Sequence, residues 1–256
     1  MLDWTELTLF LYINARVSGF ILFNPILGRT NIPATFRSGM ALVLSWFVMG
    51  VTGQEVPAPT GVLELLMHLL LEMALGFLLG MAVNFFFYIV QLAGSMIDTQ
   101  MGMTMNQMYD AGAQANLSVT GMILNVLMTL LFFAAGGHLT LLRIFLTSEE
   151  IVPLGAVSIG LPAYRYLLEL FVQCTILAVK LCMPVLAAEL LAQVGMGVLM
   201  KVIPQINVFA INIELKVIVG LGLLFMLVVP FSEFLIDAER MMLGSLHEIL
   251  LLSTGG

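Results

Sequence analysis

Charged residues are scarce in this chain of 256 residues: Asp, Glu, Lys and Arg make up 10% of it, against about 25% in soluble domains. Hydrophobic residues make up 61%, and the mean hydropathy is +1.07, so the composition predicts a protein in or against a membrane. Nine Lys and Arg stand against 16 Asp and Glu. Without an excess of basic residues the chain has no patch for a phosphate backbone, which excludes nucleic-acid binding.

The motifs of common enzymes are also missing. The chain has no GxSxG turn, no Walker loop and no GxGxxG fingerprint, which excludes the usual sites of acyl transfer and nucleotide binding. His247 and Glu248 begin a zincin-like pair, but Leu251 occupies the position of the second His. Tyr109 and Asp110 resemble half of an intramembrane aspartyl protease, without the second carboxylate. We therefore expect no enzyme, no cofactor and no bound metal.

Cysteine is rare as well. Cys174 and Cys182 lie eight residues apart on one predicted helix, about 12 Å along its axis and beyond disulfide reach. We expect both to be small core residues.

The N-terminus is acidic rather than basic and no cleavage pattern follows it, so the first apolar segment is expected to stay in the mature protein.

What the chain does have is a series of apolar helical segments. The pattern predicts a first helix over 7–23 that carries Arg16, a turn-rich connector over 24–39 and an apolar run over 40–51 that is too short to span a bilayer. Arg16 is expected to face a protein interior or to snorkel to the interface. Later helices are predicted over 117–146 and 165–203 and, at the end, 215–229 and 231–250, with residues 147–164 as a loop. We expect kinks or breaks at three prolines: Pro184, Pro204 and Pro230.

Residues 62–97 contain no proline and predict one helix of about 54 Å, longer than the roughly 30 Å core of a bilayer. Small and polar residues recur on one face of it at steps of three and four. Hydrocarbon cannot satisfy such a face, so we expect it to contact another subunit or line a wet passage. Its members are Gly76, Gly80, Asn84, Tyr88, Gln91, Ser95 and Asp98, with Gly102 beyond them.

Two features of this helix point to packing and to chemistry. Gly76 and Gly80 form a small-xxx-small pair that lets a second helix approach closely. Glu64, His68 and Glu72 share one side of the helix, which suggests either a metal or proton site or a strip of polar contacts. The first of these alternatives would suit a proton-coupled or small-molecule transporter.

The segment from Asp98 to Asn116 interrupts the apolar pattern, and methionines are concentrated in it. Methionine is unbranched and polarisable, so a cluster of it re-packs around varied partners. Such a segment suits either a soft seal or an ordinary buried loop. The residues that we assign to a seal are Met101, Gly102, Met103, Met105 and Met108.

A set of residues in a characteristic order covers nearly the whole chain: Arg16, Pro25 and Pro33; Gly94, Asp98, Gln100, Met101 and Gly102; Gly136 to His138; Pro153 and Gly155; Pro184 and Val185; Pro204, Gln205 and 207–209; Lys216 and Gly220. In the order and spacing of these residues the chain resembles the FliR family, the R subunit of the flagellar type III protein-export gate, whose injectisome relatives share the same plan. One departure is the segment Ala210 to Glu214, where the family usually has Gly and Pro.

The resemblance implies an all-α membrane-associated fold, with long, kinked helical hairpins packed into a hetero-oligomeric helical assembly. Residues 1–256 would form one export-gate domain, with a FliP-like part over 1–165 and a FliQ-like hairpin over 166–256. The implied partners are FliP, FliQ and FlhB, membrane lipid, and unfolded flagellar proteins in transit. The implied location is the inner membrane at the centre of the flagellar basal body, where the segment that begins at Met101 would plug the closed channel.

Overall fold

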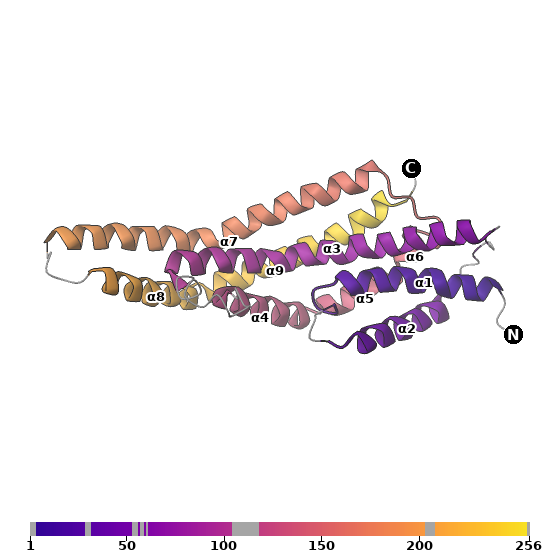
Figure 1. The fold of residues 1–256 in the computed structure, drawn as a ribbon, viewed down its shortest axis with the longest axis horizontal. Coiled ribbons are helices and arrows are strands. Elements are labelled where there is room, and N and C mark those ends of the chain that lie inside the picture. Colours follow the sequence, from indigo (N-terminus) through magenta and orange to yellow (C-terminus); the bar gives the residue numbers. More distant parts are fainter. Residues whose placement is uncertain are drawn as a thin grey trace. The chain divides into compact units, whose positions relative to one another are not determined.

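The computed structural model describes residues 4–28, 32–52, 56, 59, 61–103, 118–202 and 208–254. Within these residues the chain is helical, and its only bridge between extended segments is a single antiparallel pairing of Val157 with Thr254. This confirms the predicted all-α fold. The helices are α1 (Trp4–Phe23), α2 (Ala34–Val51), α3 (Val62–Met101), α4 (Val119–Ala134), α5 (Gly137–Leu146), α6 (Ser148–Ile151), α7 (Leu161–Val202), α8 (Val208–Met226) and α9 (Val228–Leu252) (Figure 1).

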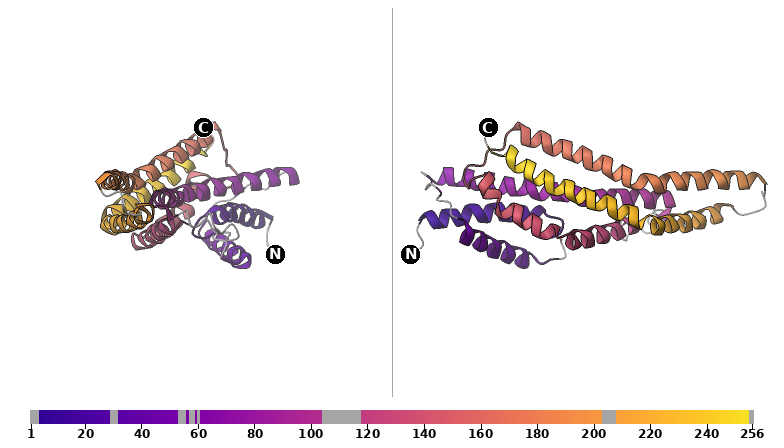
Figure 2. Two further views of the ribbon diagram at one scale, coloured as in Figure 1. Left: turned by 60° about the vertical axis from the view of Figure 1, so that its left-hand side comes forward. Right: turned by 180° about the vertical axis from the view of Figure 1, so that it is seen from behind.

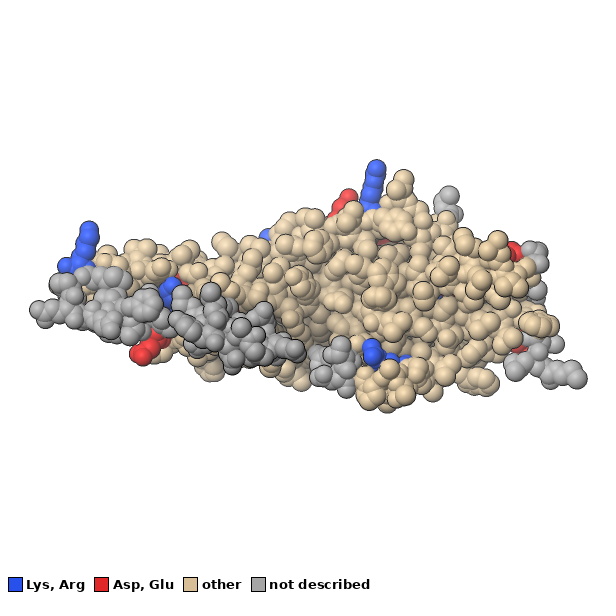
Figure 3. Space-filling view, in the orientation of Figure 1, with Lys and Arg blue, Asp and Glu red and all other residues tan. Residues whose placement is uncertain are grey.

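Four of these helices are long and apolar enough to cross a membrane: α1, α2, α3 and residues 161–199 of α7. The number rises to six if the bent pairs α4 with α5–α6 and α8 with α9 each count as one span. These counts apply to the described part of the chain. Large apolar side chains remain exposed on these helices, among them Trp46 on α2 and Phe225 on α8. Figure 3 shows few charged atoms on the face in view. The predicted membrane protein is therefore confirmed.

The helices form two compact units. Unit 1 comprises Met1–Phe86, Gly136–Val172 and Glu239–Gly256, and unit 2 comprises Phe87–Ala135 and Gln173–Ala238. Three helices, α3, α7 and α9, contribute residues to both units. In unit 1, α1 and α2 pack as an antiparallel pair, and they remain side by side in all the views of Figures 1 and 2.

Glycines let α1 and α3 pack backbone against backbone in unit 1. A Cβ atom on Gly76 would overlap the carbonyl oxygen of Arg16, and one on Gly80 would lie 2.8 Å from the carbonyl oxygen of Phe20. Gly19 makes the same kind of contact from α1, against the backbone of Met73. The close approach predicted for Gly76 and Gly80 is confirmed, and the helix that approaches belongs to the same chain.

The boundaries of several helices differ from the prediction. The helix α2 begins at Ala34 rather than Met40, because the carbonyl of Pro33 accepts the first hydrogen bonds, from the N–H groups of Phe36 and Arg37. Its 18 residues make it a candidate span, so the prediction that it is too short was wrong. The helix α3 continues to Met101, four residues past the predicted end, and stops at Gly102, whose φ of +79° a residue with a side chain rarely adopts.

Two predicted segments are divided differently. The helix predicted over 117–146 is broken into α4 and α5 at Gly136, which has a φ of +76°. The loop predicted over 147–164 contains the short helix α6, and its last residues belong to α7. At the break, Gly136 has a φ that residues with a side chain rarely adopt. At the start of α6, Ser148 is buried and its hydroxyl donates to the carbonyl of Phe145 at 2.6 Å.

The three prolines have different outcomes. The helix α7 continues through Pro184, so the predicted interruption is absent, while a bend there stays a prediction. Pro204 lies outside the described residues. The last helices break at Leu227 with a bend of 61°, three residues before Pro230. A proline ring clashes with the carbonyl four residues earlier, here that of Met226, so the break falls on the N-terminal side of the proline.

Replacing Gly76 with Ala should destabilise the protein, because the new methyl group meets main-chain atoms of α1 that cannot rotate away. We expect a loss of about 1–3 kcal/mol, the usual cost of overpacking, seen as a lower midpoint of thermal unfolding in detergent. The matched control is Gly39→Ala within α2, where a Cβ would meet nothing within 4 Å. That change should leave the midpoint equal or raise it, because alanine favours a helix over glycine by up to about 1 kcal/mol. Equal midpoints for the two variants would contradict the packing argument.

Candidate functional site

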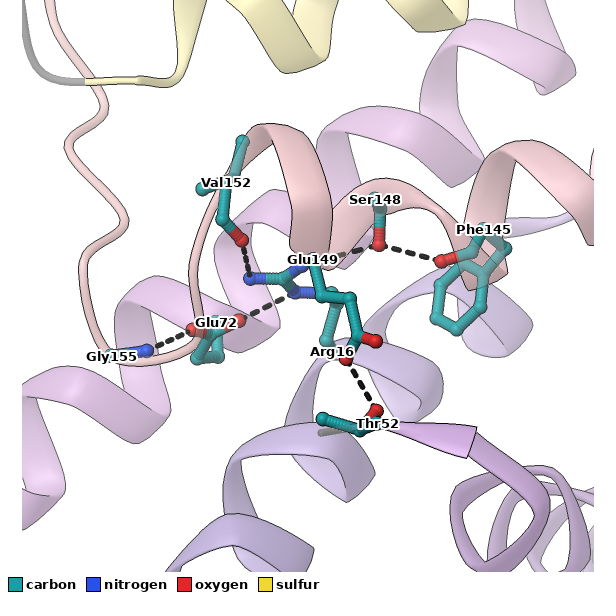
Figure 4. A network of polar contacts seen from close by, with 8 residues as sticks. All are labelled: Arg16, Thr52, Glu72, Phe145, Ser148, Glu149, Val152 and Gly155. Carbon is teal, nitrogen blue, oxygen red and sulfur yellow. Dashed lines mark hydrogen bonds and ion pairs between the residues drawn. The ribbon is translucent and has the colours of Figure 1, made fainter. Parts of the chain in front are cut away.

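A buried ion pair joins α1 and α3 within unit 1. Arg16 on α1 is 2% exposed and donates through Nε to Oε2 of Glu72 on α3, at 2.6 Å. Its Nη1 donates to Ser148 Oγ at 3.1 Å and its Nη2 to the carbonyl oxygen of Val152 at 3.0 Å. The guanidinium therefore joins α1, α3 and the segment around α6 (Figure 4). Arg16 faces the protein interior, which is the first of the two predicted alternatives.

Both carboxylate oxygens of Glu72 accept hydrogen bonds inside this network. Its second oxygen accepts from the backbone N–H of Gly155 at 2.8 Å, and Glu72 has no exposed surface. Glu149 accepts a hydrogen bond from the hydroxyl of Thr52 at the edge of the same network (Figure 4). Buried charges are tolerated when they are paired and when their remaining donors and acceptors are satisfied. The arrangement is that of a structural clamp.

The predicted set of Glu64, His68 and Glu72 does not come together as a ligand site. His68 Nε2 lies 3.9 Å from Glu64 Oε1 at a partly exposed position, and its ring packs edge-on against Tyr12. Glu72 is held by Arg16 instead. Among the described residues no three His, Cys, Asp or Glu side chains gather closely enough to hold a metal ion. The strip-of-contacts interpretation fits these positions.

In unit 2 the last turns of α3 meet the start of α4. Asp98 is 3% exposed, and its carboxylate accepts from Ser118 Oγ at 2.7 Å and from the backbone N–H of Thr120 at 3.2 Å. Ser118 caps α4, since its Oγ accepts from the N–H of Gly121 at 2.8 Å. A carboxylate at a helix N-terminus is also favoured by the helix dipole. The polar end of the predicted stripe is therefore satisfied within the chain.

The other residues of the predicted stripe fall into two groups, those with contacts inside the chain and those exposed in the middle of α3. Gly76 and Gly80 contact α1, as described above, and Ser95 donates to the carbonyl of Leu92 in its own helix. Asn84, Tyr88 and Gln91 in the middle of α3 are exposed. Asn84 makes one long hydrogen bond, 3.4 Å, to the carbonyl of Phe23. A contact with another subunit stays a prediction, and these three exposed residues are the ones that we assign to it.

Of the predicted seal residues, three are described. Met101 is fully buried, and its side chain lies against Gly220 of α8, where a Cβ would come within 2.6 Å of the methionine Cε. Gly102 ends the helix, and Met103 is half-buried. Met105 and Met108 lie outside the described residues. Sequence reasoning missed the partners Gly220 and Ser118, although a serine directly before an apolar helical run is a known cap signal.

The two cysteines are free and buried in unit 2, as predicted. Cys182 lies with its sulfur 3.6 Å from the sulfur of Met96, and its thiol donates to the carbonyl of Val179 at 3.2 Å.

Removing one member of the ion pair should leave the other charge buried and unpaired. We expect Arg16→Met or Glu72→Met to lower the stability of unit 1 by about 3–5 kcal/mol. The double variant Arg16→Met with Glu72→Met should be less damaging than the sum of the single changes, because no charge is then stranded. Thermal unfolding in detergent measures all three variants.

The control for that prediction is Glu64→Gln. The Glu64 side chain is 43% exposed and lies 3.9 Å from His68, and an exposed ion pair contributes about 1 kcal/mol or less, so this change should shift stability by less than about 1 kcal/mol. Additive effects of Arg16→Met and Glu72→Met would show that the two side chains do not stabilise each other.

Comparison with known proteins assigns the chain to a family. The model of the bacterial export proteins, family 1, matches residues 7–241. The chain is 28% identical to the flagellar biosynthetic protein FliR of Bacillus subtilis over 212 residues, 81% of each chain. It is 26% identical to FliR of Escherichia coli K12 over 215 residues, 84% of this chain and 81% of that protein.

A relative with another name matches over a similar length. The surface presentation of antigens protein SpaR of Salmonella typhimurium is 28% identical over 203 residues, 79% of this chain and 76% of SpaR. The family model extends over most of the chain, from the first turn of α1 into α9, and includes the ion pair, the α3–α4 junction and the long helices described above. The chain belongs to the bacterial export proteins, family 1.

Proposed function

We propose that this protein is a core channel subunit of the flagellar type III secretion export gate, where it helps to form and to plug the conduit for unfolded flagellar proteins. Its relatives that are called flagellar biosynthetic proteins support the flagellar assignment, since three of them match over 81% or more of both chains. The proposed location is the inner membrane at the centre of the basal body.

The observation that carries the proposal is an exposed polar stripe on an apolar helix. Residues 161–199 of α7 are apolar enough to span a membrane, and only 33% of their most apolar window is buried. Yet Glu169, Gln173 and Lys180 are exposed along this helix, at spacings of four and seven residues that place them on one face. Charged and amide groups are costly in hydrocarbon. They favour contact with other subunits or with a water-filled conduit.

Helix length supports the same conclusion. The 40 residues of α3 extend for about 60 Å and the 42 residues of α7 for about 63 Å, at 1.5 Å per residue. The hydrocarbon core of a bilayer is about 30 Å thick. Helices of this length fit an assembly that stands partly outside the bilayer better than a bundle surrounded by lipid. The exposed Asn84, Tyr88 and Gln91 of α3 are the residues that we assign to the contact with a neighbouring subunit.

We name FliP, FliQ and FlhB as the partners, on the basis of the family resemblance. The same resemblance divides the chain into a FliP-like part, 1–165, and a FliQ-like hairpin, 166–256. The two compact units interleave along the sequence, so this division concerns resemblance and stays a proposal. Transport would be driven by other components, because the sequence contains no nucleotide motif.

The plug is assigned to the segment that follows α3. Gly102 ends the helix with a left-handed turn, and Met103, Met105 and Met108 follow within six residues. Flexible, polarisable side chains can close around one another and still part for chains of any sequence. A transporter that uses Glu64, His68 and Glu72 has less support, because the carboxylate of Glu72 is already paired with the guanidinium of Arg16.

Deleting residues 103–108 should make the assembled gate leak small ions. Met101 is kept because it packs on Gly220 within unit 2. We expect an increased ion conductance of membranes that contain the complex, at equal amounts of complex. The control replaces Met103, Met105 and Met108 with Leu, which keeps an apolar seal and should leak far less. Unchanged conductance after the deletion would argue against a plug.

A photo-crosslinker at Met103 should capture a stalled export substrate. The control position is Trp46 on α2, which is 71% exposed on an apolar helix and which we do not place at the conduit. Equal capture at both positions, or none at Met103, would place the conduit elsewhere and contradict the assignment.

A further inference from the structure

One acidic side chain lies on the buried face of α7 within unit 2. Buried residues recur along this helix at steps of four, three and four: Ala178, Cys182, Val185 and Glu189. This is the spacing of a single helical face. The first three are small or apolar, and all four are 0% exposed. The carboxyl group of Glu189 is therefore held in a row of side chains that offer it no strong hydrogen-bond donor.

Neither oxygen of this carboxyl group has a partner. Oε1 and Oε2 of Glu189 are both buried, and within the described part of the chain they accept no hydrogen bond. The carboxylates of Glu72 and Asp98 are similarly buried, but each of them accepts hydrogen bonds from two neighbours. Glu189 thus differs in its surroundings from the two buried acids that have structural roles.

A cation lies on a second helix of the same unit. Lys216 of α8 is half-buried, and its positive charge acts on Glu189. Among the charged and titratable groups of the described residues, Lys216 is the one whose field reaches this carboxyl group. The two side chains are not in contact as an ion pair, since both oxygens of Glu189 are without a partner.

An ionised carboxylate is costly in such a position. It loses its hydration on burial, and no N–H or O–H group of the described chain replaces the lost water. A cation compensates for this loss when it is in direct contact with the carboxylate, and Lys216 is not. The neutral acid has no net charge, so it loses far less hydration on burial. Binding a proton therefore makes Glu189 compatible with its apolar surroundings.

We propose that Glu189 is a proton-binding site in unit 2. In the conformation described here it holds a proton and is neutral, and Lys216 is the counter-ion available to the carboxylate once that proton has passed to water. Because the two residues belong to different helices, the charge of Glu189 would alter the attraction between α7 and α8. The site is independent of the function proposed above, since it follows from contacts inside unit 2.

The test is an infrared difference spectrum of the full-length chain in lipid membranes at neutral pH. Subtracting the spectrum of Glu189→Gln from that of the unaltered chain should leave the C=O stretching band of a neutral carboxylic acid. The control is Glu248→Gln, at an exposed position near the end of α9, whose difference spectrum should show the bands of an ionised carboxylate. Carboxylate bands in the Glu189 difference spectrum would overturn the proposal.

The role of Lys216 is tested by following the same acid band as the pH is raised. A nearby cation favours the ionised form of an acid, so in Lys216→Met the band should persist to higher pH than in the unaltered chain. Lys216→Arg keeps the positive charge and should leave that pH unchanged. If the Met and Arg variants lose the band at the same pH, Lys216 is not the counter-ion.

The amount of protein supplies a second readout. The amide of glutamine is neutral and close in shape to a protonated carboxyl group, so Glu189→Gln should accumulate in the membrane to the level of the unaltered chain. A chain that needed the negative charge of Glu189 would lose most of its protein in this variant, as a broken ion pair would. Such a loss would contradict a neutral Glu189.

Discussion

The ion pair between Arg16 and Glu72 shows the constraint under which this chain folds. In a protein with so few charges, a buried polar group is stabilised when it finds a partner inside the protein. Arg16 achieves this with three acceptors from α3, α6 and the residue after α6, and Glu72 with two donors. Since these donors and acceptors come from segments far apart in the sequence, satisfying one guanidinium determines how several helices pack in unit 1.

Close helix packing is what brings these partners within reach. Gly76 lies one turn after Glu72, and the backbone of Arg16 rests on it. A side chain at position 76 would push α1 away from α3 and lengthen the ion pair. The same combination occurs in unit 2, where Gly94 and Gly121 bring α3 against α4, and Asp98, one turn later, reaches the cap of α4. A small residue and a polar residue one turn apart thus act together at both ends of α3.

Polar residues that lie exposed on apolar helices are informative for the same reason. Gln173 and Lys180 on α7, and Tyr88 and Gln91 on α3, are exposed on helices otherwise suited to a membrane. The family match places the chain among export proteins, and the proposed gate would supply what lipid lacks: donors and acceptors from neighbouring subunits, or water in a conduit. Polar residues with partners inside the chain stabilise its own fold, and the exposed ones are those that we assign to contacts in the proposed assembly.

The sequence by itself determined the all-α class, the proline-free helix that became α3, the close approach at Gly76 and Gly80, and the core position of Cys174 and Cys182. These follow from composition and from the spacing of residues along one helix, which are local properties. Helix ends were less predictable, because Pro33, Ser148 and Gly136 act through backbone hydrogen bonds and dihedral angles rather than through apolar periodicity. Only the tertiary structure decided that Glu72 pairs with Arg16 rather than with His68, and that Asp98 reaches Ser118. Such partners are separated by tens of residues, so their pairing depends on how the helices pack and no periodic pattern in the sequence records it.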